Sequence, residues 1–154
     1  MLATRRSVLV GAIVLALLLI PIPYRACPTW DAWVVDETGR PVPGMTVRLV
    51  YQDYSAESRS HEVNRVTDER GHVVFTAQLS SASILRRCYY TGLSATAGAH
   101  ASFGRHAWVF AFGKGLEGTA TTGQIVADWT GSPYHVESRI VAAVRNLAPS
   151  GTNH

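Results

Sequence analysis

The sequence predicts an all-β protein folded as a single β-sandwich. Several short segments alternate apolar and polar residues with a period of two, which is typical of strands with one buried face. Two Asp-x-x-Gly turns, at residues 36–39 and 68–71, separate such segments. In each turn the Asp carboxylate can accept backbone N–H groups and the Gly can adopt a positive φ, so both turns are expected to reverse the chain.

Residues 1–26 are predicted to be a signal peptide or a signal anchor, outside the folded domain. Arg5 and Arg6 precede an uninterrupted run of thirteen residues without a polar side chain, residues 8–20. At 1.5 Å per residue this run spans about 20 Å, less than the roughly 30 Å of a bilayer core. The run therefore has the length of a signal-peptide core, and export is the predicted role.

The residues that follow the apolar run favour a leader that is not cleaved. A small-x-small cleavage pattern is missing because Tyr24 occupies the third position back, and Pro21 to Tyr24 extend the apolar stretch, so an uncleaved anchor is favoured. The positive-inside rule places the N-terminus in the cytoplasm. The predicted location is the cytoplasmic membrane, with one transmembrane helix and a periplasmic or extracellular domain. The alternative is a cleaved, secreted domain.

The charge of the exported part argues against a nucleic-acid partner. Three of the 14 basic residues lie in the leader, so eleven basic residues remain against 11 acidic ones. The pI of about 9.1 therefore reflects the leader and does not indicate a nucleic-acid surface. About 128 residues follow the leader, enough for one hydrophobic core.

Period-two alternation places the expected strands along the chain. They cover residues 32–36, 46–51, 62–67, 72–79, 88–95, 101–112, 124–129 and 136–144. The last two form an expected terminal hairpin, although Val136, Ile140 and Val144 would equally suit a helix. Residues 27–147 make up the predicted sandwich domain, and residues 148–154 a flexible tail.

Two prolines mark an expected crossing between the sheets. Pro41 and Pro43 each remove a backbone donor and fix φ, which suits a connection at a sheet edge better than a central strand. The next strand is expected to start after Gly44.

The residues from Trp33 to Leu79 resemble the carboxypeptidase regulatory-like domain. The resemblance consists of Asp-x-x-Gly-x-Pro-x-x-Gly at residues 36–44, Val-x-Leu at 47–49, and Thr-Asp-x-x-Gly-x-Val-x-Phe at 67–75. It covers about 47 of 154 residues and involves turn and core positions. It implies a Greek-key sandwich of the transthyretin-like or Cna-B-like (Ig-like) type, found on secreted and cell-envelope proteins. The chain departs from the family pattern after residue 79.

Cys27 and Cys88 are the only cysteines, and a disulfide between them is predicted from the oxidising compartment. Closing a loop of about 60 residues would stabilise the fold by about 4 kcal/mol in the chain-entropy model. The alternative is two unpaired cysteines that pack as small apolar residues.

No catalytic, cofactor or metal site is predicted. The chain has six histidines, but no CxxC or HExxH motif accompanies them. No serine lies in a Gly-x-Ser-x-Gly elbow. The acidic residues of the two turns lack the Asp-x-Asp spacing of a calcium loop, so a role in the turns is the better interpretation.

Tryptophans are the candidate binding residues. Trp30 and Trp129 have polar neighbours and are predicted to be exposed, whereas Trp108 and Trp33 fit the core. The sequence thus predicts a non-enzymatic structural or protein-binding module of the cell envelope. The alternative is a carbohydrate-binding accessory domain that uses Trp30 and Trp129. The expected partners are the membrane, through residues 1–26, and an envelope protein or a glycan.

Overall fold

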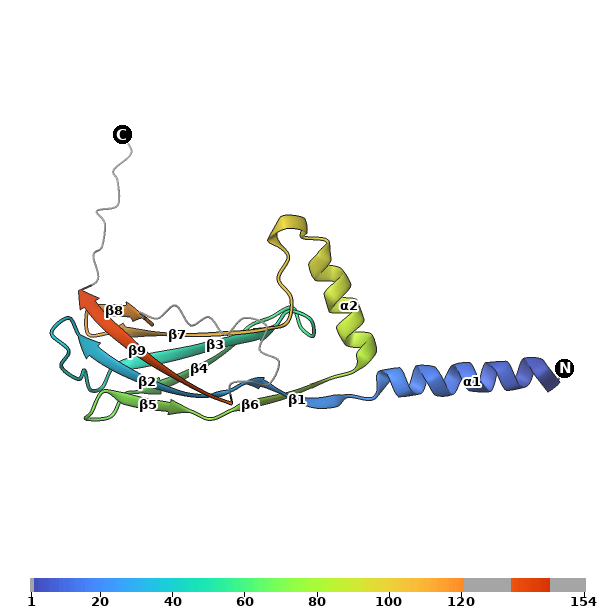
Figure 1. Ribbon diagram of the computed structural model, residues 1–154, viewed down its shortest axis with the longest axis horizontal. Helices are drawn as coiled ribbons and strands as arrows, with labels where there is room; N and C mark the ends of the chain where they lie inside the picture. Colours follow the sequence, from blue (N-terminus) through green and yellow to red (C-terminus); the bar gives the residue numbers. More distant parts are fainter. Residues whose placement is uncertain (1, 121–133, 145–154) are drawn as a thin grey trace, which may run out of the picture.

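The computed structural model describes residues 2–120 and 134–144. Figure 1 shows a long N-terminal helix that projects from a body of strands, and a second helix beside the junction between the two. The elements in chain order are α1 (Leu2–Leu19), β1 (Ile22–Cys27), β2 (Thr29–Asp36), β3 (Thr46–Asp53), β4 (His61–Val66), β5 (His72–Phe75), β6 (Gln78–Ala82), α2 (Ile84–Ala95), the 3-10 turn η1 (Gly98–His100), β7 (Arg105–Gly113), β8 (Leu116–Thr119) and β9 (His135–Val144). The predicted mainly β fold is confirmed.

The strands form a seven-stranded sheet that folds over on itself, and a separate two-stranded ribbon of β1 and β6. The order in the large sheet is β4-β3-β7-β8-β9-β2-β5. β8 and β9 share only the pairs Leu116 with Val144 and Glu117 with Ala143, so the sheet is narrowly joined there. β2 runs parallel to β9, whereas its pairing with β5 is antiparallel. The junction divides the sheet into two parts, β4-β3-β7-β8 and β9-β2-β5, and each part forms one of the two layers of a sandwich.

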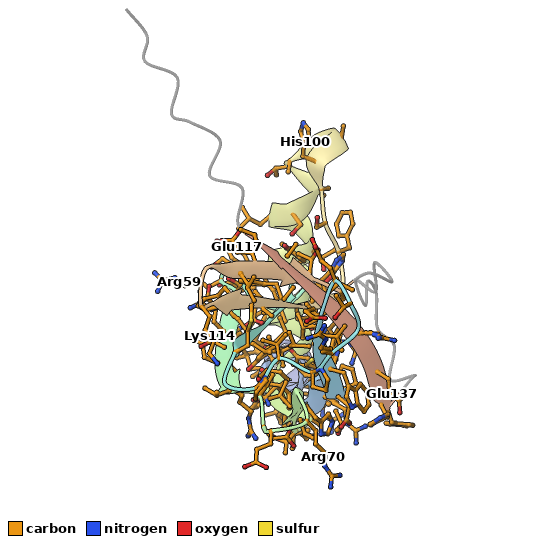
Figure 2. All side chains as sticks on the ribbon, turned by 90° about the vertical axis from the view of Figure 1, so that its left-hand side faces the viewer. Arg59, Arg70, His100, Lys114, Glu117 and Glu137 are labelled. Carbon is orange, nitrogen blue, oxygen red and sulfur yellow. The ribbon has the colours of Figure 1, made fainter. Side chains whose placement is uncertain are left out.

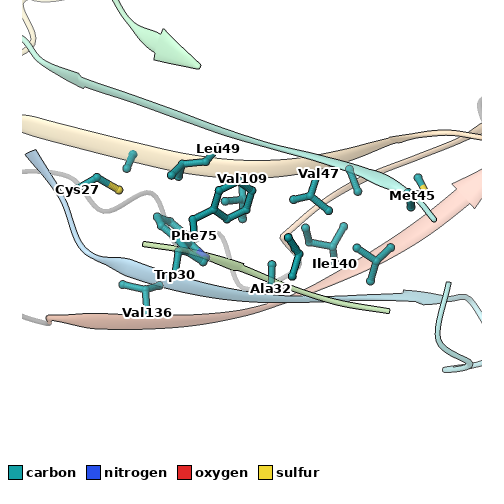
Figure 3. Packing of buried hydrophobic residues seen from close by; sticks show 14 of the residues in the cluster. Cys27, Trp30, Ala32, Met45, Val47, Leu49, Phe75, Val109, Val136 and Ile140 are labelled. Atoms are coloured by element: carbon teal, nitrogen blue, oxygen red, sulfur yellow. The ribbon is translucent and has the colours of Figure 1, made fainter. Parts of the chain in front are cut away.

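The core lies between these two layers. Alternation along β2 buries Trp30, Ala32 and Val34, and β9 contributes every second residue from Val136 to Ala142. Figure 3 shows Leu49 and Val109 of the opposite layer packing toward Trp30 and Phe75. Within residues 2–120 and 134–144, the buried cluster consists of Cys27, Trp30, Ala32, Val34, Met45, Val47, Leu49, Val73, Phe75, Ala107, Val109, Ala111, Val136, Ile140 and Ala142.

Both predicted Asp-x-x-Gly turns are confirmed. Asp36 Oδ1 accepts the backbone N–H groups of Thr38 and Arg40, at 2.8 and 2.9 Å. Asp68 Oδ1 accepts the corresponding groups of Arg70 and His72, at 2.9 and 2.8 Å. The turn glycines have positive φ, as expected. These hydrogen bonds favour the ionised carboxylates and hold the pKa values of Asp36 and Asp68 below their usual range, with the Thr38 side chain and the His72 backbone as the main causes.

The crossing predicted at the two prolines is also confirmed. β2 and β3, which lie on either side of it, belong to different layers. Pro41 makes an isolated bridge to Val35 at the end of β2, and Gly44 donates its N–H to the Thr67 carbonyl at 3.0 Å. The segment thus leaves one layer, closes the end of the core and enters the other.

α2 replaces one of the expected strands, so the prediction of a strand at residues 88–95 is wrong. Ser83 caps the helix by accepting the N–H of Arg86 at 3.2 Å. Leu85, Tyr89 and Leu93 follow at intervals of four, which is helical spacing. The expected strand at 72–79 is also divided: β5 pairs with β2, and β6 pairs with β1.

β1 begins earlier than the predicted domain boundary at residue 26. Ile22 pairs with Ala82 and Tyr24 with Ser80, and Ala26 is almost fully buried. Residues 22–26, which the sequence analysis assigned to the leader, therefore belong to the folded part. Residues 136–144, for which a strand and a helix were both considered, form a strand. The expected strand at 124–129 and the tail at 148–154 lie outside the described residues.

α1 covers most of the predicted leader. Its side chains from Arg6 onward are exposed, except Leu18, which is partly buried, and the helix contacts α2. Among the described residues, no helix combines the length and the apolarity required to cross a bilayer.

Candidate binding surfaces

The predicted pair of exposed tryptophans is not found. Trp30 is fully buried, and its indole N–H donates to Ser138 Oγ at 3.0 Å, so its assignment to a binding face is wrong. Trp129 lies outside the described residues. Trp33, which was expected in the core, lies on the outer face of β2 and is partly exposed. Its ring stacks on His72 with 4.7 Å between ring centroids.

The two cysteines are unpaired, so the predicted disulfide is absent from the structure. Cys27 is fully buried in the core, whereas Cys88 is exposed on α2. Burial raises the pKa of the Cys27 thiol to about 12, which keeps it protonated at neutral pH. The helix explains the difference from the prediction, because it carries Cys88 out of the sheet.

A groove on the outer face of β3, β7 and β8 is the main candidate site. Alternation along β7 directs Ala107, Val109 and Ala111 into the core and leaves Phe110 and Phe112 on the outer face, partly exposed. The two rings lie 5.8 Å apart, centroid to centroid. The groove has a volume of about 740 Å³ and is lined by Arg48, Phe110, Ala111, Phe112, Gly113, Gly115, Leu116, Glu117, Gly118 and Thr119. We call it the aromatic groove.

Arg48 is held in a fixed position beside these rings. Its guanidinium makes a 2.8 Å ion pair with Glu62, and its Nε donates to Asn64 Oδ1 at 2.8 Å. Both partners lie on β4, which pairs with β3. The guanidinium carbon lies 5.2 Å from the centroid of Phe112 and 6.0 Å from that of Phe110, within cation–π range. The groove thus presents a pre-positioned cation on an aromatic floor.

Gly118 lets β8 form one side of the groove. A Cβ at this position would meet the Val141 carbonyl oxygen at 2.5 Å, so only glycine allows β8 to approach β9 this closely. Glu117 and Thr119, on either side of Gly118, add a carboxylate and a hydroxyl to the lining. The groove therefore offers apolar, cationic and acidic groups together, a composition suited to binding by contact area and charge.

A second cluster lies on the outer face of the opposite layer. Asp31 of β2 contacts two imidazoles: its Oδ1 lies 2.7 Å from His72 Nε2, and its Oδ2 lies 3.3 Å from His135 Nε2. Glu137 Oε1 is 3.4 Å from the same His135 nitrogen. Figure 2 shows Glu117 of the groove and Glu137 of this cluster on opposite sides of the sandwich. We call Asp31, Trp33, His72, His135 and Glu137 the histidine cluster.

The histidine cluster does not have the geometry of a metal site. Both imidazole nitrogens contact a carboxylate oxygen directly, and no group of three or more His, Cys, Asp or Glu side chains in residues 2–120 and 134–144 is arranged to hold an ion. His106 lies apart from this cluster and contacts the Phe103 carbonyl at 2.9 Å through its ring nitrogen.

A third polar cluster joins α2 to the sandwich. Asp53, at the end of β3, is fully buried and accepts a hydrogen bond from Arg87 Nη1 of α2 at 3.1 Å. The ring of Tyr24 lies beside the guanidinium groups of Arg87 and Arg105, at 4.3 and 5.8 Å. Burial raises the pKa of Tyr24, and desolvation lowers that of Arg105. These contacts fix the helix against the sandwich.

The aromatic groove could have been found from the sequence. Trp108, Phe110 and Phe112 alternate with alanine and valine, which places the large rings on one face and the small residues on the other. Small residues fit a densely packed interior between layers, which leaves the aromatic face outside. The prediction that Trp108 packs in the core is therefore wrong, because Trp108 is partly exposed on this outer face. The role of Arg48 has no such signal, because its partners Glu62 and Asn64 depend on strand register.

Comparisons with known proteins give little guidance. No protein-family model matches the chain, and no curated protein matches it. Among solved structures, 3-chlorocatechol 1,2-dioxygenase from Rhodococcus opacus 1CP aligns with a TM-score of 0.47 and 16% identity, over 82% of this chain and 63% of that chain. Catechol 1,2-dioxygenase from Acinetobacter radioresistens aligns with a TM-score of 0.36 and 12% identity, over 83% and 56%. The chain thus spans less than two thirds of either dioxygenase, and likenesses this weak carry no argument about activity.

Proposed function

We propose that this protein is a non-enzymatic binding module of the cell envelope that recognises a protein partner through the aromatic groove. We further propose that residues 1–21, the part of the predicted leader that precedes β1, hold it at the cytoplasmic membrane, with the sandwich on the outer side. The observation that carries the binding role is Arg48, fixed by Glu62 and Asn64 against two partly exposed phenylalanine rings.

The composition of the groove supports a protein partner. Arginine and aromatic residues are enriched among the residues that contribute most to protein–protein affinity. Because Arg48 is already held by β4, little side-chain entropy is lost when a partner packs against it. Glu117 at the rim supplies an opposite charge, which favours a partner surface of mixed charge over a purely apolar one.

The direct connection of α1 to β1 supports the anchoring role. α1 ends at Leu19 and β1 begins at Ile22, so only two residues separate the apolar helix from a strand paired with β6. Cleavage after residue 26 would cut through that strand. We therefore propose that the mature protein keeps its leader.

We also propose that the sandwich is a Greek-key domain of the carboxypeptidase regulatory-like type. The two Asp-x-x-Gly turns and the proline crossing, all of which form as the resemblance implies, support this assignment. The departure after residue 79 falls where the chain forms β6 and α2.

Site-specific photo-crosslinking tests the binding role. A photoreactive amino acid at Thr119, in the groove, is expected to give one crosslinked protein species in envelope membranes, and the same probe at Val74, on the opposite layer, is not. Arg48→Ala should abolish the Thr119 product. An unchanged product in Arg48→Ala, or equal products from both positions, would contradict a role for the groove.

Carbohydrate binding remains a second proposal, now favoured by Trp33. This ring is partly exposed and stacks on His72, whose Nε2 contacts the Asp31 carboxylate, and an aromatic platform next to polar groups suits a sugar. Retention of the intact protein on insoluble polysaccharide should fall in Trp33→Ala or Trp129→Ala if this is the function. Absence of retention on every glycan tested would exclude it.

A further inference from the structure

α2 binds the sandwich through its polar side. Arg86 Nε donates to the Ala56 carbonyl at 2.7 Å, Arg87 pairs with Asp53, and Ser94 Oγ donates to the Tyr54 carbonyl at 3.1 Å. The three contacts reach the last residue of β3 and the segment that follows it. An amphipathic helix on a soluble domain usually packs its apolar side inward, so this orientation is inverted.

The apolar side of α2 is therefore turned away from the sandwich. No residue of the helix is buried. Leu85, Tyr89 and Leu93, spaced four residues apart, are 43%, 64% and 49% exposed, and Ile84 at the start of the helix is 45% exposed. Exposed apolar side chains that gather on one helix face indicate a surface with a partner.

α2 lies beside the end of α1 (Figure 1). The two helices contact each other, and Leu18 is the partly buried side chain of α1. Figure 1 shows α2 rising steeply from the point where α1 meets the sandwich, while α1 projects away from the body of the protein. A plane that α1 entered end-on would therefore run along α2, on the side opposite the sandwich.

We propose that the apolar face of α2 lies in the interfacial layer of the lipid bilayer that holds α1, an inference that rests on the anchoring role proposed above. Helices of this kind bury their apolar face about 5–10 Å into the headgroup and acyl boundary. Tyr89 has the amphipathic ring that is enriched at that depth. With α2 bound to lipid, the sandwich is fixed in orientation relative to the membrane.

Lipid fits this face better than a protein partner does. α2 contacts α1, whose apolar side chains are also exposed, so one apolar phase would cover both helices. The three polar contacts to the sandwich hold α2 in place before any partner binds, which suits contact with a plane that α1 alone has already brought close.

Cys88 provides a native position for a probe on this face. It is exposed one turn after Ile84 and Leu85, whereas Cys27 is buried and protonated, so a thiol-reactive fluorophore at neutral pH should label Cys88 alone. The intact protein is labelled and reconstituted into vesicles of phosphatidylethanolamine and phosphatidylglycerol. Spin-labelled lipids, with the nitroxide either near the headgroup or near the end of the acyl chain, serve as quenchers, and iodide quenches from the water.

The expected result is flotation with the vesicles, blue-shifted emission, protection from iodide, and stronger quenching by the shallow nitroxide than by the deep one. The control carries the probe at Arg70→Cys in a Cys88→Ser background, in the turn before β5, and should remain accessible to iodide and unquenched by lipid. Leu85→Glu and Leu93→Glu should reduce lipid quenching of the Cys88 probe several-fold without unfolding the sandwich, because neither side chain is buried.

Three results would overturn the inference. If the protein floats while its Cys88 probe remains accessible to iodide, α2 does not contact the lipid, although the proposed anchoring by α1 stands. A probe shielded from iodide but unquenched by either lipid would show that protein, such as a second copy of the chain, covers α2. A protein that does not float would reject the anchoring and this inference together.

Discussion

Among the glycines that the structure describes, Gly71 has the least room for a side chain. A Cβ there would lie 2.4 Å from the Val34 carbonyl oxygen and 3.1 Å from the Val42 nitrogen, both backbone atoms, and φ is +71°. Gly115 has nearly the same φ, +73°, but no atom within 4 Å of a Cβ. A side chain at Gly115 would meet only the strain of the positive φ, whereas one at Gly71 would also overlap with neighbouring atoms.

We predict that Gly115→Ala destabilises the protein by about 1 kcal/mol, from the left-handed backbone alone. Gly71→Ala should cost about 1–3 kcal/mol more, because the added methyl group must displace backbone. Urea unfolding of both variants measures the difference. Equal losses of stability would contradict the close packing of the Asp68 turn against β2.

Asp68 links this turn to acid stability. Its pKa is lowered in the folded protein by hydrogen bonds from backbone N–H groups, His72 first. A lowered folded-state pKa contributes stability above the unfolded-state value of about 3.9, and that stability is lost as the pH falls through the folded-state pKa. The contribution of Asp68 to stability therefore changes with pH only in the acidic range.

Asp68→Asn should therefore flatten the dependence of stability on pH below about 4, because the amide oxygen accepts the same hydrogen bonds without titrating. Urea midpoints measured from neutral pH down to acid would show the wild-type protein losing more stability than the variant. Glu69→Gln is the control, since it removes a carboxylate of the same turn that accepts neither bond. A variant as acid-sensitive as the wild type would reject this role.

Trp30 was predicted to be exposed but is fully buried. Its polar neighbours Thr29 and Asp31 suggested exposure, but adjacent residues of a strand point to opposite faces, so polar neighbours indicate a buried position. Trp33, by the same alternation, is on the outer face. Applied strictly, the period of two would have assigned both correctly.

α2 is the element for which local contacts matter most, since no residue in it is buried. Its attachment depends on Arg87, which pairs with the fully buried Asp53, and on Arg86, which donates to a backbone carbonyl. Removing Arg87 leaves a buried carboxylate without its partner on the helix, whereas removing Arg86 leaves one carbonyl group with one hydrogen bond fewer.

We predict that Arg87→Met costs about 3 kcal/mol of stability and Arg86→Met about 1 kcal/mol. The first variant should also increase amide hydrogen exchange throughout residues 84–95, because the helix loses its main attachment. Urea unfolding and exchange mass spectrometry measure the two effects. Equal costs for the neighbouring arginines would show that the pairing with Asp53 does not hold the helix.

The strands were largely predictable and the helix was not recognised. β3 and β7 have unambiguous alternation, and the turns carry their own signals in Asp and Gly. In α2, by contrast, residues 88–95 were predicted as a strand from period-two alternation, although Ser83 and the four-residue spacing of Leu85, Tyr89 and Leu93 were helical signals. The partners of β1 and β9 depend on contacts distant in sequence, which no local pattern contains.

At the scale of the whole molecule, the proposed membrane segment and the folded domain meet at the junction of α1 with β1. The strand that follows the leader is paired with β6 and contributes Cys27 to the core. A leader removed at residue 26 would take most of that strand with it. The folded domain and the membrane segment are therefore proposed to be one continuous unit.

The intact mass of the protein recovered from the membrane and soluble envelope fractions tests this claim most directly. Thiol alkylation is performed before and after denaturation, without a reducing agent. We predict a full-length chain in the membrane fraction, with one alkyl group at Cys88 in the native protein and a second at Cys27 only after denaturation. A shortened, soluble chain would contradict the anchored module, and two cysteines that both resist alkylation even after denaturation would contradict the unpaired thiols of the structure.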